Sequence, residues 1–281
     1  MENRVVDQIL NCMAIFGDDP TIQRAQTEHR LKLADFWGIS VGSKVLEIGC
    51  GQGDTTAVLS YLVGEQGLVY GIDIASSDYG APITLGEAQD YLKKSKLGKQ
   101  INIAFETDIL SSHLDFPEDF FDYIVLSHCS WYFKSFQELS AVFEKIKKWG
   151  KKLCYAEWDT RIQKIEQQSH FLAVLVQAQY ECFNENSEAN VRTLFTPKDV
   201  NMIAEKVGWT IISDQSIYSP KLQDGEWEVN YTLSEYKGHN GVNDIPEKLK
   251  LLVESEMFLL EESLSNHEVK PMSTYAFIAR R

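Results

Sequence analysis

The chain has 281 residues, 44% of them hydrophobic, which is enough for one large buried core. Its formal net charge is −14, from 27 Lys and Arg against 41 Asp and Glu. Proteins that bind nucleic acid or acidic membranes usually present clustered cations, so we expect neither as a partner. The richest basic stretch, 145–152, surrounds a predicted helix end, where cations complement the helix dipole; an anion-binding patch is the alternative.

The cysteines are few and scattered. Their number is odd and no two have the spacing of metal ligands, so we expect reduced, buried thiols and no metal site. The N-terminus carries no visible secretory signal, and no apolar run approaches the roughly 20 residues of a membrane helix. We therefore expect a cytoplasmic protein without a membrane partner, and the sequence leaves the oligomeric state open. The cysteines are Cys12, Cys50, Cys129, Cys154 and Cys182.

Between residues 41 and 158, short apolar runs alternate with amphipathic stretches. Nearly continuous apolar strands separated by helices predict an α/β fold with a parallel sheet and helices on both faces. The runs predict strands at 44–49, 68–74, 101–108, 121–128 and 151–158. The stretches between them predict helices at 55–64, 84–98 and 135–150.

The organisation changes after residue 158. Apolar spacing predicts a helix at 162–183, and Thr196 followed by Pro197 predicts the start of another, which ends near Gly208. A strand at 210–219, a helix at 246–266 and a last strand at 273–281 complete the series. Glycines and aromatic residues predict a loop or lid at 220–245. We expect a single domain, 1–281, with a cofactor-binding core at about 25–160 and cap insertions at about 161–195 and 220–271.

A glycine-rich turn follows the first predicted strand. Gly49, Gly51 and Gly53 allow the backbone to turn tightly and approach a ligand closely. Asp73 ends the second predicted strand, where a carboxylate accepts hydrogen bonds from both ribose hydroxyls. Asp108 ends the third, where it can bind an adenine amino group. Since ligands of open α/β sheets bind at the carboxyl ends of the strands, these residues predict a nucleoside site.

Asp54 helps to decide between two nucleoside cofactors. Nicotinamide-dependent dehydrogenases have Gly or Ala at this position of their glycine motif, and a carboxylate there would repel a pyrophosphate at the helix N-terminus. S-adenosylmethionine contains adenine and ribose but no phosphate, and it carries a sulfonium cation. The sequence favours S-adenosylmethionine and leaves a NAD-dependent oxidoreductase as the alternative.

The segments LEIGCGQGDTT, GIDI and ETDIL resemble the cofactor motifs of class I S-adenosylmethionine-dependent methyltransferases. LFTPKDVNMIAEKVGW resembles a segment of the small-molecule members, although it ends in Val-Gly-Trp. The resemblance covers about 25–160 well and 192–219 moderately. It implies a Rossmann-like, mostly parallel sheet of seven strands with the last one antiparallel. It also implies that the cofactor is bound by Glu47, Gly49, Cys50, Gly51, Gly53, Asp73, Ile74, Asp108, Ile109, Ser127 and His128.

The segment after the fourth strand bears on the methyl acceptor. Methyltransferases of this class that act on exocyclic amines or amides of nucleic acid or protein often carry an Asn/Asp-Pro-Pro-aromatic motif at this position. This chain has Ser127-His128-Cys129-Ser130-Trp131 instead, which favours another acceptor atom on a small molecule. His128 is a candidate general base, or else a packing histidine. Further candidates are Glu157 as base or anchor and, for the substrate pocket, Trp131, Tyr132, Trp227 and Tyr231, for which ordinary packing is the alternative.

The predicted function is in-line transfer of a methyl group from S-adenosylmethionine to a small-molecule acceptor, with S-adenosylhomocysteine as product. Alignment and exclusion of water dominate such a reaction, so no catalytic triad is expected. A cyclopropanating enzyme with the same cofactor and a non-catalytic cofactor-binding protein remain further alternatives.

Overall fold

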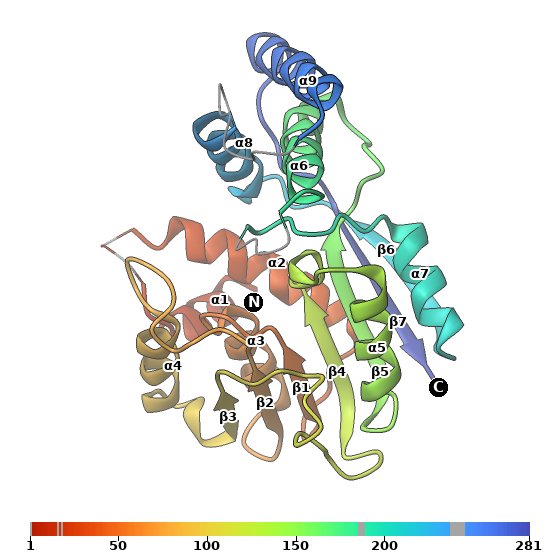
Figure 1. Ribbon diagram of the computed structural model, residues 1–281. Helices are drawn as coiled ribbons and strands as arrows, with labels where there is room; N and C mark the ends of the chain where they lie inside the picture. Colours follow the sequence, from red (N-terminus) through yellow and green to blue (C-terminus); the bar gives the residue numbers. More distant parts are fainter. Residues whose placement is uncertain (1, 16, 18, 185–188, 237–244) are drawn as a thin grey trace.

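The computed structural model describes residues 2–15, 17, 19–184, 189–236 and 245–281. Its centre is a seven-stranded sheet in the order β3-β2-β1-β4-β5-β7-β6 (Figure 1). The first five strands in the sequence are parallel, and β7 is antiparallel to both of its neighbours, β5 and β6. The predicted Rossmann-like sheet with an antiparallel last strand is therefore confirmed. The strands are β1 Lys44–Ile48, β2 Leu68–Ile72, β3 Ile101–Ala104, β4 Phe121–Ser127, β5 Gly150–Trp158, β6 Thr210–Ile217 and β7 Thr274–Arg280.

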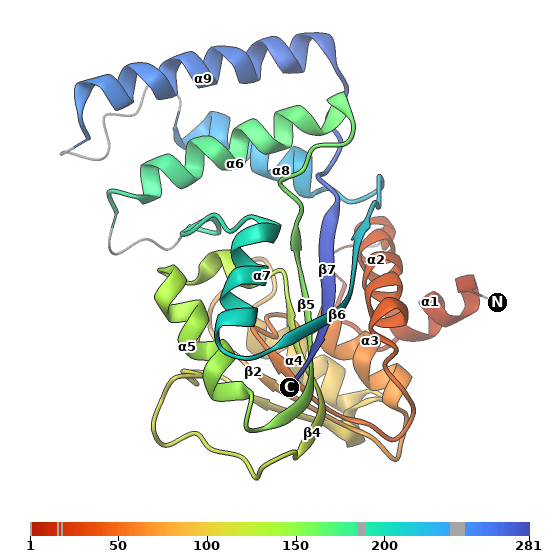
Figure 2. The ribbon, with the colours of Figure 1, turned by 90° about the vertical axis from the view of Figure 1, so that its right-hand side faces the viewer.

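Helices cover both faces of the sheet, as the alternation of strands and helices predicts. On one face lie α1 Glu2–Leu10, α2 Thr21–Trp37, α3 Asp54–Val63 and α4 Leu85–Lys94. On the other lie α5 Phe136–Ile146 and α7 Pro197–Lys206 (Figure 2). The start of α7 is the one predicted: Asp199 N–H donates to Thr196 Oγ1 (3.2 Å), and Thr196 N–H donates to the Asp199 carboxylate (3.0 Å).

Two predicted strands end earlier than expected. β2 ends at Ile72 and β3 at Ala104, so Ile74 and Asp108 lie in the loops that follow. Glu106 has a φ of 50°, which turns the chain out of the strand direction. The two loops still run side by side, because Asp73 N–H donates to Ala104 O at 3.0 Å.

Three helices form a cap at the carboxyl ends of the strands (Figure 2). These are α6 Gln168–Glu181, α8 Asp224–Glu235 and α9 Glu247–Asn266, which share an apolar core. Most of the helix predicted at 162–183 is present as α6, preceded by a 3-10 turn at Ile165–Gln167. Cys182 follows the end of α6 and is exposed, so the expectation of a buried thiol was wrong for this residue.

The loop predicted at 220–245 is wrong in its central part, which forms α8. Gly225, which suggested a loop, lies in the first turn of this helix. A Cβ at Gly225 would lie 3.0 Å from Lys270 O, so the glycine permits close packing instead of breaking the helix. Residues 237–244 of the predicted loop lie outside the described residues.

Lysines of the basic stretch 145–152 form ion pairs with nearby carboxylates. Lys148 pairs with Asp115 at 3.1 Å, and Lys151 pairs with Asp122 at 2.8 Å. These pairs favour a structural role over the anion-binding alternative. In the part of the chain that the structure describes, no helix combines the length and apolar character needed to cross a membrane.

Candidate active site

The glycine turn between β1 and α3 presents its backbone to open space. Gly49, Gly51 and Gly53 have φ values of 73°, 50° and 91°. A Cβ at Gly49 would lie 2.6 Å from Cys129 Cβ, so that glycine permits packing within the protein. A Cβ at Gly51 would meet no atom within 4 Å. The turn therefore leaves room at Gly51 for a ligand to contact the backbone.

Asp73 holds the glycine turn from the end of the neighbouring strand. Gly51 N–H donates to Asp73 Oδ2 at 2.8 Å, and Ala75 N–H donates to Asp73 Oδ1 at 2.9 Å. A carboxylate oxygen accepts more than one hydrogen bond, so both oxygens keep capacity for the hydroxyls of a ribose. The carboxylate is thus fixed in position beside the open space at Gly51.

Glu47 lies beneath the turn. Its side chain is 2% exposed, and Thr56 on α3 donates to Glu47 Oε2 at 2.6 Å. Burial raises the pKa of Glu47 to about 8. The next motif residue, Cys50, is also buried, and burial raises the pKa of its thiol, which leaves it unreactive. Both residues support the turn from within.

The loops after β2 and β3 hold three further residues that the resemblance assigns to the cofactor. Ile74 is 70% exposed, a large apolar side chain open to a planar ligand. Asp108 is exposed, and its Oδ1 accepts from Leu110 N–H at 2.8 Å. Ile109 is buried in the main core. The structure therefore brings Asp73, Ile74 and Asp108 to one edge of the sheet.

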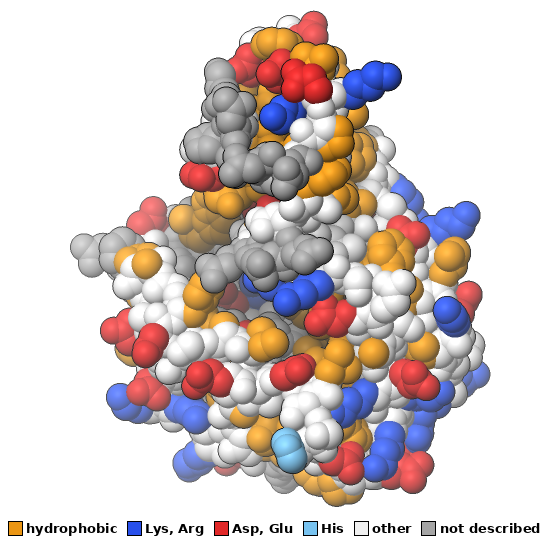
Figure 3. All heavy atoms as spheres, viewed as in Figure 1, with side chains coloured by type: hydrophobic (Ala, Val, Ile, Leu, Met, Phe, Trp, Pro, Cys, Tyr) orange, Lys and Arg blue, Asp and Glu red, His pale blue; other side chains and the backbone are white. Residues whose placement is uncertain are grey.

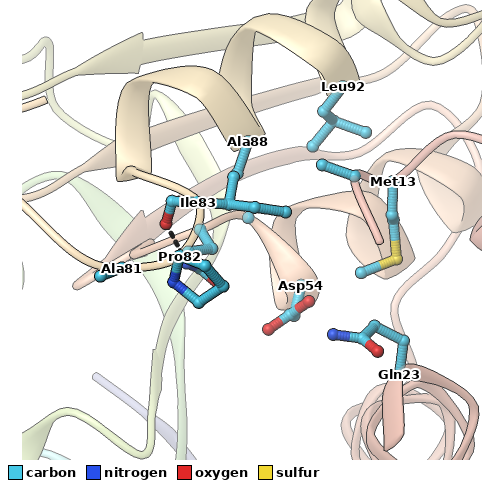
Figure 4. A pocket seen from close by; sticks show the side chains of 11 residues that line it. Met13, Gln23, Asp54, Ala81, Pro82, Ile83, Ala88 and Leu92 are labelled. Carbon is cyan, nitrogen blue, oxygen red and sulfur yellow. Dashed lines mark hydrogen bonds between the residues drawn. The ribbon is translucent and has the colours of Figure 1, made fainter. Parts of the chain in front are cut away.

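A small cavity lies beside the turn, on the side of α4 (Figure 4). Its volume of about 130 Å³ is below the roughly 300 Å³ at which ligand pockets begin, so it is too small for a whole cofactor. Gln52 Nε2 donates to Ile83 O at 2.7 Å across one wall. The cavity extends the space around the turn but does not replace the strand ends as the nucleoside site.

Ser127 and His128 lie at the end of β4. His128 has a φ of 51°, and its N–H donates to Ala156 O on β5 at 2.9 Å. His128 Nδ1 lies 3.5 Å from Glu157 Oε1. Glu157 is buried, and its Oε2 accepts from Ser130 N–H (3.1 Å) and Ser130 Oγ (2.8 Å). The buried Ser127 hydroxyl has no hydrogen-bond partner among the described residues.

A second histidine, which the sequence did not reveal, completes this group. His29 comes from α2, and its Nε2 lies 3.3 Å from His128 Nε2. Thr274 Oγ1 on β7 lies 3.2 Å from His29 Nε2 and 3.5 Å from His128 Nε2. On its other side, His29 Nδ1 lies 3.0 Å from Ser219 Oγ, which also accepts from Lys32 Nζ at 3.1 Å.

The donors and acceptors allow this chain of contacts to run in one direction from Ser219 to His128. A lysine ammonium only donates, so the Ser219 hydroxyl is free to direct its proton to His29 Nδ1. In that arrangement neutral His29 carries its proton on Nε2 and donates to His128 Nε2, and a neutral His128 carries its proton on Nδ1, towards Glu157. If Ser219 accepts from His29 Nδ1 instead, the chain runs in the opposite direction. Burial and the positive charge of His128, when protonated, and of other nearby cations hold the pKa of His29 well below its usual range, so this ring is neutral.

The aromatic candidates near the carboxyl ends of β4 and β5, which we call the rim, differ in their surroundings. Trp131 is 2% exposed, packs against Trp158 and donates from Nε1 to Phe195 O at 3.3 Å, so it belongs to the core. Tyr132 is 42% exposed, and its hydroxyl donates to Asn190 Oδ1 at 3.0 Å. Of the two, only Tyr132 is open to a ligand in this structure.

The cap contributes Trp227 and Tyr231, which lie one turn apart on α8 and are both exposed. Between them is Glu228, a buried residue whose carboxylate accepts from Gln177 Nε2 at 2.8 Å. Glu228 also accepts a hydrogen bond from Asn190, the partner of Tyr132 at the rim. This connection links the cap to the strand ends, and no spacing in the sequence points to it.

The strand order, the glycine turn after β1 and the acid after β2 define a class I S-adenosylmethionine-dependent methyltransferase. The model of the methyltransferase domain family matches residues 39–208, more than half of the chain, so the chain belongs to that family. S-adenosylmethionine is the cofactor of this class.

Known proteins support the same assignment. A cyclopropane-fatty-acyl-phospholipid synthase-like protein from Lactobacillus casei has 35% sequence identity, with 100% of both chains covered and a TM-score of 0.89. Methyltransferase phomM′ of Diaporthe leptostromiformis is 31% identical over 48% of this chain and 40% of its own length. The ubiquinone/menaquinone biosynthesis C-methyltransferase UbiE of Vibrio vulnificus is 35% identical over 34% of this chain and 33% of its own length. The chain thus covers less than half of each of these two relatives.

Proposed function

We propose that this protein transfers the methyl group of S-adenosylmethionine to a small-molecule acceptor by in-line displacement, giving S-adenosylhomocysteine. One observation carries the cofactor site: the open space at Gly51 lies beside the Asp73 carboxylate, and a hydrogen bond of 2.8 Å fixes the two to each other. The bound cofactor supplies an activated methyl group on a sulfonium. The protein contributes alignment and exclusion of water.

In this proposal, Asp73 binds the ribose hydroxyls, and Ile74 and Asp108 lie against the adenine, with Ile109 behind them. The backbone of the glycine turn lines the methionine part, and Glu47 and Cys50 hold that turn from within. Ser127 and His128 complete the site at the end of β4. The residues of the turn are Gly49, Gly51 and Gly53.

The acceptor site is proposed to lie between the rim of β4 and β5 and the cap. We assign to it three exposed aromatic side chains, Tyr132 after β4 and Trp227 and Tyr231 on α8, with Trp131 supporting the rim from the core. UbiE and phomM′ are both named as methyltransferases, and UbiE is named for ubiquinone and menaquinone biosynthesis. These names support a small-molecule acceptor.

His128 and Glu157 are proposed to hold the acceptor and, where its nucleophilic atom carries a proton, to accept that proton. His128 Nε2 is engaged by His29, so this lone pair becomes free only when His29 turns its N–H to another acceptor. Thr274 Oγ1, 3.2 Å from His29 Nε2, is such an acceptor. A rotation of the His29 ring that moves its hydrogen bond to Thr274 would therefore free this lone pair without moving the backbone.

A second candidate function is cyclopropanation of an unsaturated acyl chain. The likeness along the whole chain to the protein from Lactobacillus casei favours it through that protein's name. When the nucleophilic atom of the acceptor carries a proton, both reactions add one CH₂ to the acceptor overall, since a methyl group arrives and a proton leaves. Nuclear magnetic resonance of the product distinguishes a cyclopropane ring from a methyl group.

Thermal-shift measurements with S-adenosylmethionine, S-adenosylhomocysteine and NAD test the cofactor assignment. NAD belongs in this set because Arg30 lies 3.7 Å from Asp54 and offsets part of its negative charge. We expect stabilisation by the first two compounds and none by NAD. A panel of metabolites and unsaturated phospholipids, with S-adenosylhomocysteine release as the readout, then tests the acceptor. Stabilisation by NAD alone would contradict the proposal.

A further inference from the structure

Helix α9 has apolar residues on two opposite faces. Its inner face packs on α6 and buries Val253, Met257 and Leu260 in the apolar core that α6, α8 and α9 share. Its outer face, which we call the outer stripe, points away from α6 (Figure 2). Figure 3 shows hydrophobic side chains over α9 at the top of the molecule, bordered by acidic and basic ones. The outer stripe consists of Leu251 (55% exposed), Leu252 (49%), Ser255, Phe258 (69%) and Leu259 (50%).

Scattered exposed apolar residues are normal on a protein surface, but a continuous row of large ones marks a contact site. A helix that is apolar on both faces is usually covered on both. Among the described residues, α6 covers the inner face and leaves the large apolar residues of the outer stripe 49–69% exposed. The outer stripe therefore requires an occupant, and its pattern indicates which one.

The outer stripe reads nearly the same in both directions about Ser255. Leu251 and Leu259 lie four positions to either side, and Leu252 and Phe258 lie three positions to either side. Seven positions to either side, on the same face, are two exposed residues of opposite charge, Lys248 and Glu262. An antiparallel second copy would therefore place Lys248 against Glu262 of the partner, twice.

From this symmetry we infer that the outer stripe of α9 is an interface between two copies of this chain. The helices run antiparallel, and Ser255 lies on the two-fold axis, where a small side chain lets the backbones approach. Glu254 borders the stripe and opposes the pairing by like-charge repulsion. One pair of helices is also at the small end of the interface size range, so we expect a dissociation constant on the order of micromolar.

Sedimentation equilibrium over rising protein concentration tests the inference. The wild type is expected to reach twice the monomer mass, and Phe258→Glu is expected to remain monomeric. Met202→Glu is the matched control, because Met202 is 54% exposed on α7, away from α9. Circular dichroism verifies that all variants are folded. A wild type that stays monomeric well above micromolar concentration, or a dimer that Phe258→Glu leaves intact, overturns the inference.

Charge reversal tests the antiparallel arrangement. Lys248→Glu and Glu262→Lys are each expected to weaken the dimer several-fold, and the double variant is expected to regain most of the wild-type affinity. In a parallel pairing Lys248 would face its own copy, so absence of rescue overturns the arrangement. Flotation with vesicles of phosphatidylcholine and phosphatidylglycerol tests a lipid occupant. Binding that Phe258→Glu abolishes, in a protein that stays monomeric, would replace the second copy by a membrane surface.

Discussion

His29 Nε2 lies 3.3 Å from His128 Nε2, although the two histidines are 99 positions apart in the sequence. One comes from the second helix and the other from the end of the fourth strand. Only one of the two facing nitrogens can carry a proton when both rings are neutral. A proton on the facing nitrogen of one ring therefore excludes a proton on the facing nitrogen of the other.

The direction of this hydrogen-bond chain can be measured. We expect nitrogen-resolved nuclear magnetic resonance of the ligand-free protein to show His29 protonated at Nε2 and His128 protonated at Nδ1. Ser219→Ala removes the donor to His29 Nδ1, so both rings should then populate mixed tautomers. A His128 ring protonated at Nε2 in the wild type would show that the chain runs the other way.

Substitution of Asp73 tests the ribose contact. Asp73→Ala should weaken S-adenosylhomocysteine binding by roughly 1.5–3 kcal/mol, as expected when hydrogen bonds to a charged group are lost. Part of this loss arises from the glycine turn, because Asp73 Oδ2 also accepts from Gly51 N–H. Asp73→Asn keeps an acceptor for that bond and should show an intermediate loss. Calorimetry on all three proteins gives the comparison, and unchanged affinity in Asp73→Ala would count against the cofactor site.

Gly51 and Gly42 form a matched pair for testing the glycine turn. Both have a positive φ, 50° and 80°, and a Cβ at either position would meet no atom within 4 Å. Alanine at each should cost roughly 1–2 kcal/mol of stability because of the left-handed backbone. Only Gly51→Ala should also abolish cofactor binding, since Gly42 lies before β1 at the opposite end of that strand. Equal binding by the two variants in a titration would place the cofactor elsewhere.

The exposed aromatic residues of α8 should act on the acceptor and not on the cofactor. Replacing Trp227 and Tyr231 by Ala is expected to raise KM for the acceptor or lower kcat, while cofactor affinity stays within about threefold, less than 1 kcal/mol. Tyr91→Ala on α4 is the control, because Tyr91 is similarly exposed (52%). Normal turnover by the double variant would assign the acceptor site to the rim alone.

Glu47 should make stability depend on pH. Its pKa is about 8 in the folded protein and 4.5 when exposed, so the folded state binds more protons between these values. The stability that this group contributes is present below pH 4.5 and is lost as pH rises towards 8, by up to about 1.4 kcal/mol per pH unit. Glu47→Gln should therefore gain stability relative to the wild type across this range. Urea unfolding at several pH values gives the difference, and a pH-independent difference would refute the buried, protonated state.

The sheet and the position of the nucleoside site follow from local patterns. Apolar strands separated by helices are enough to predict an α/β sheet. Glycines and acidic residues at successive strand ends are enough to predict a binding site at one edge of it. The start of α7 also follows from local sequence, because Thr196 and Pro197 are adjacent and suit the N-cap and the first helical position.

The parts that the sequence did not reveal depend on contacts between distant segments. His29 has no motif around it and becomes part of the site only because α2 packs against the strand ends. Gly225 wrongly suggested a loop, because this position needs a glycine to pack closely against Lys270, 45 positions later, and not to form a turn. Similarly, Asn190 joins Tyr132 to Glu228 across three separate segments.

The position of β7 has a consequence for the order of folding. This strand follows α9 in the sequence, yet it lies between β5 and β6 and supplies Thr274 to both histidines. During synthesis, the preceding strands can assemble while the place of β7 is still open, with one edge of β5 unpaired. The rim of the active site is therefore incomplete until β7 is inserted, and a nascent chain that stops before Thr274 should present an unpaired strand edge to chaperones instead of a formed acceptor site.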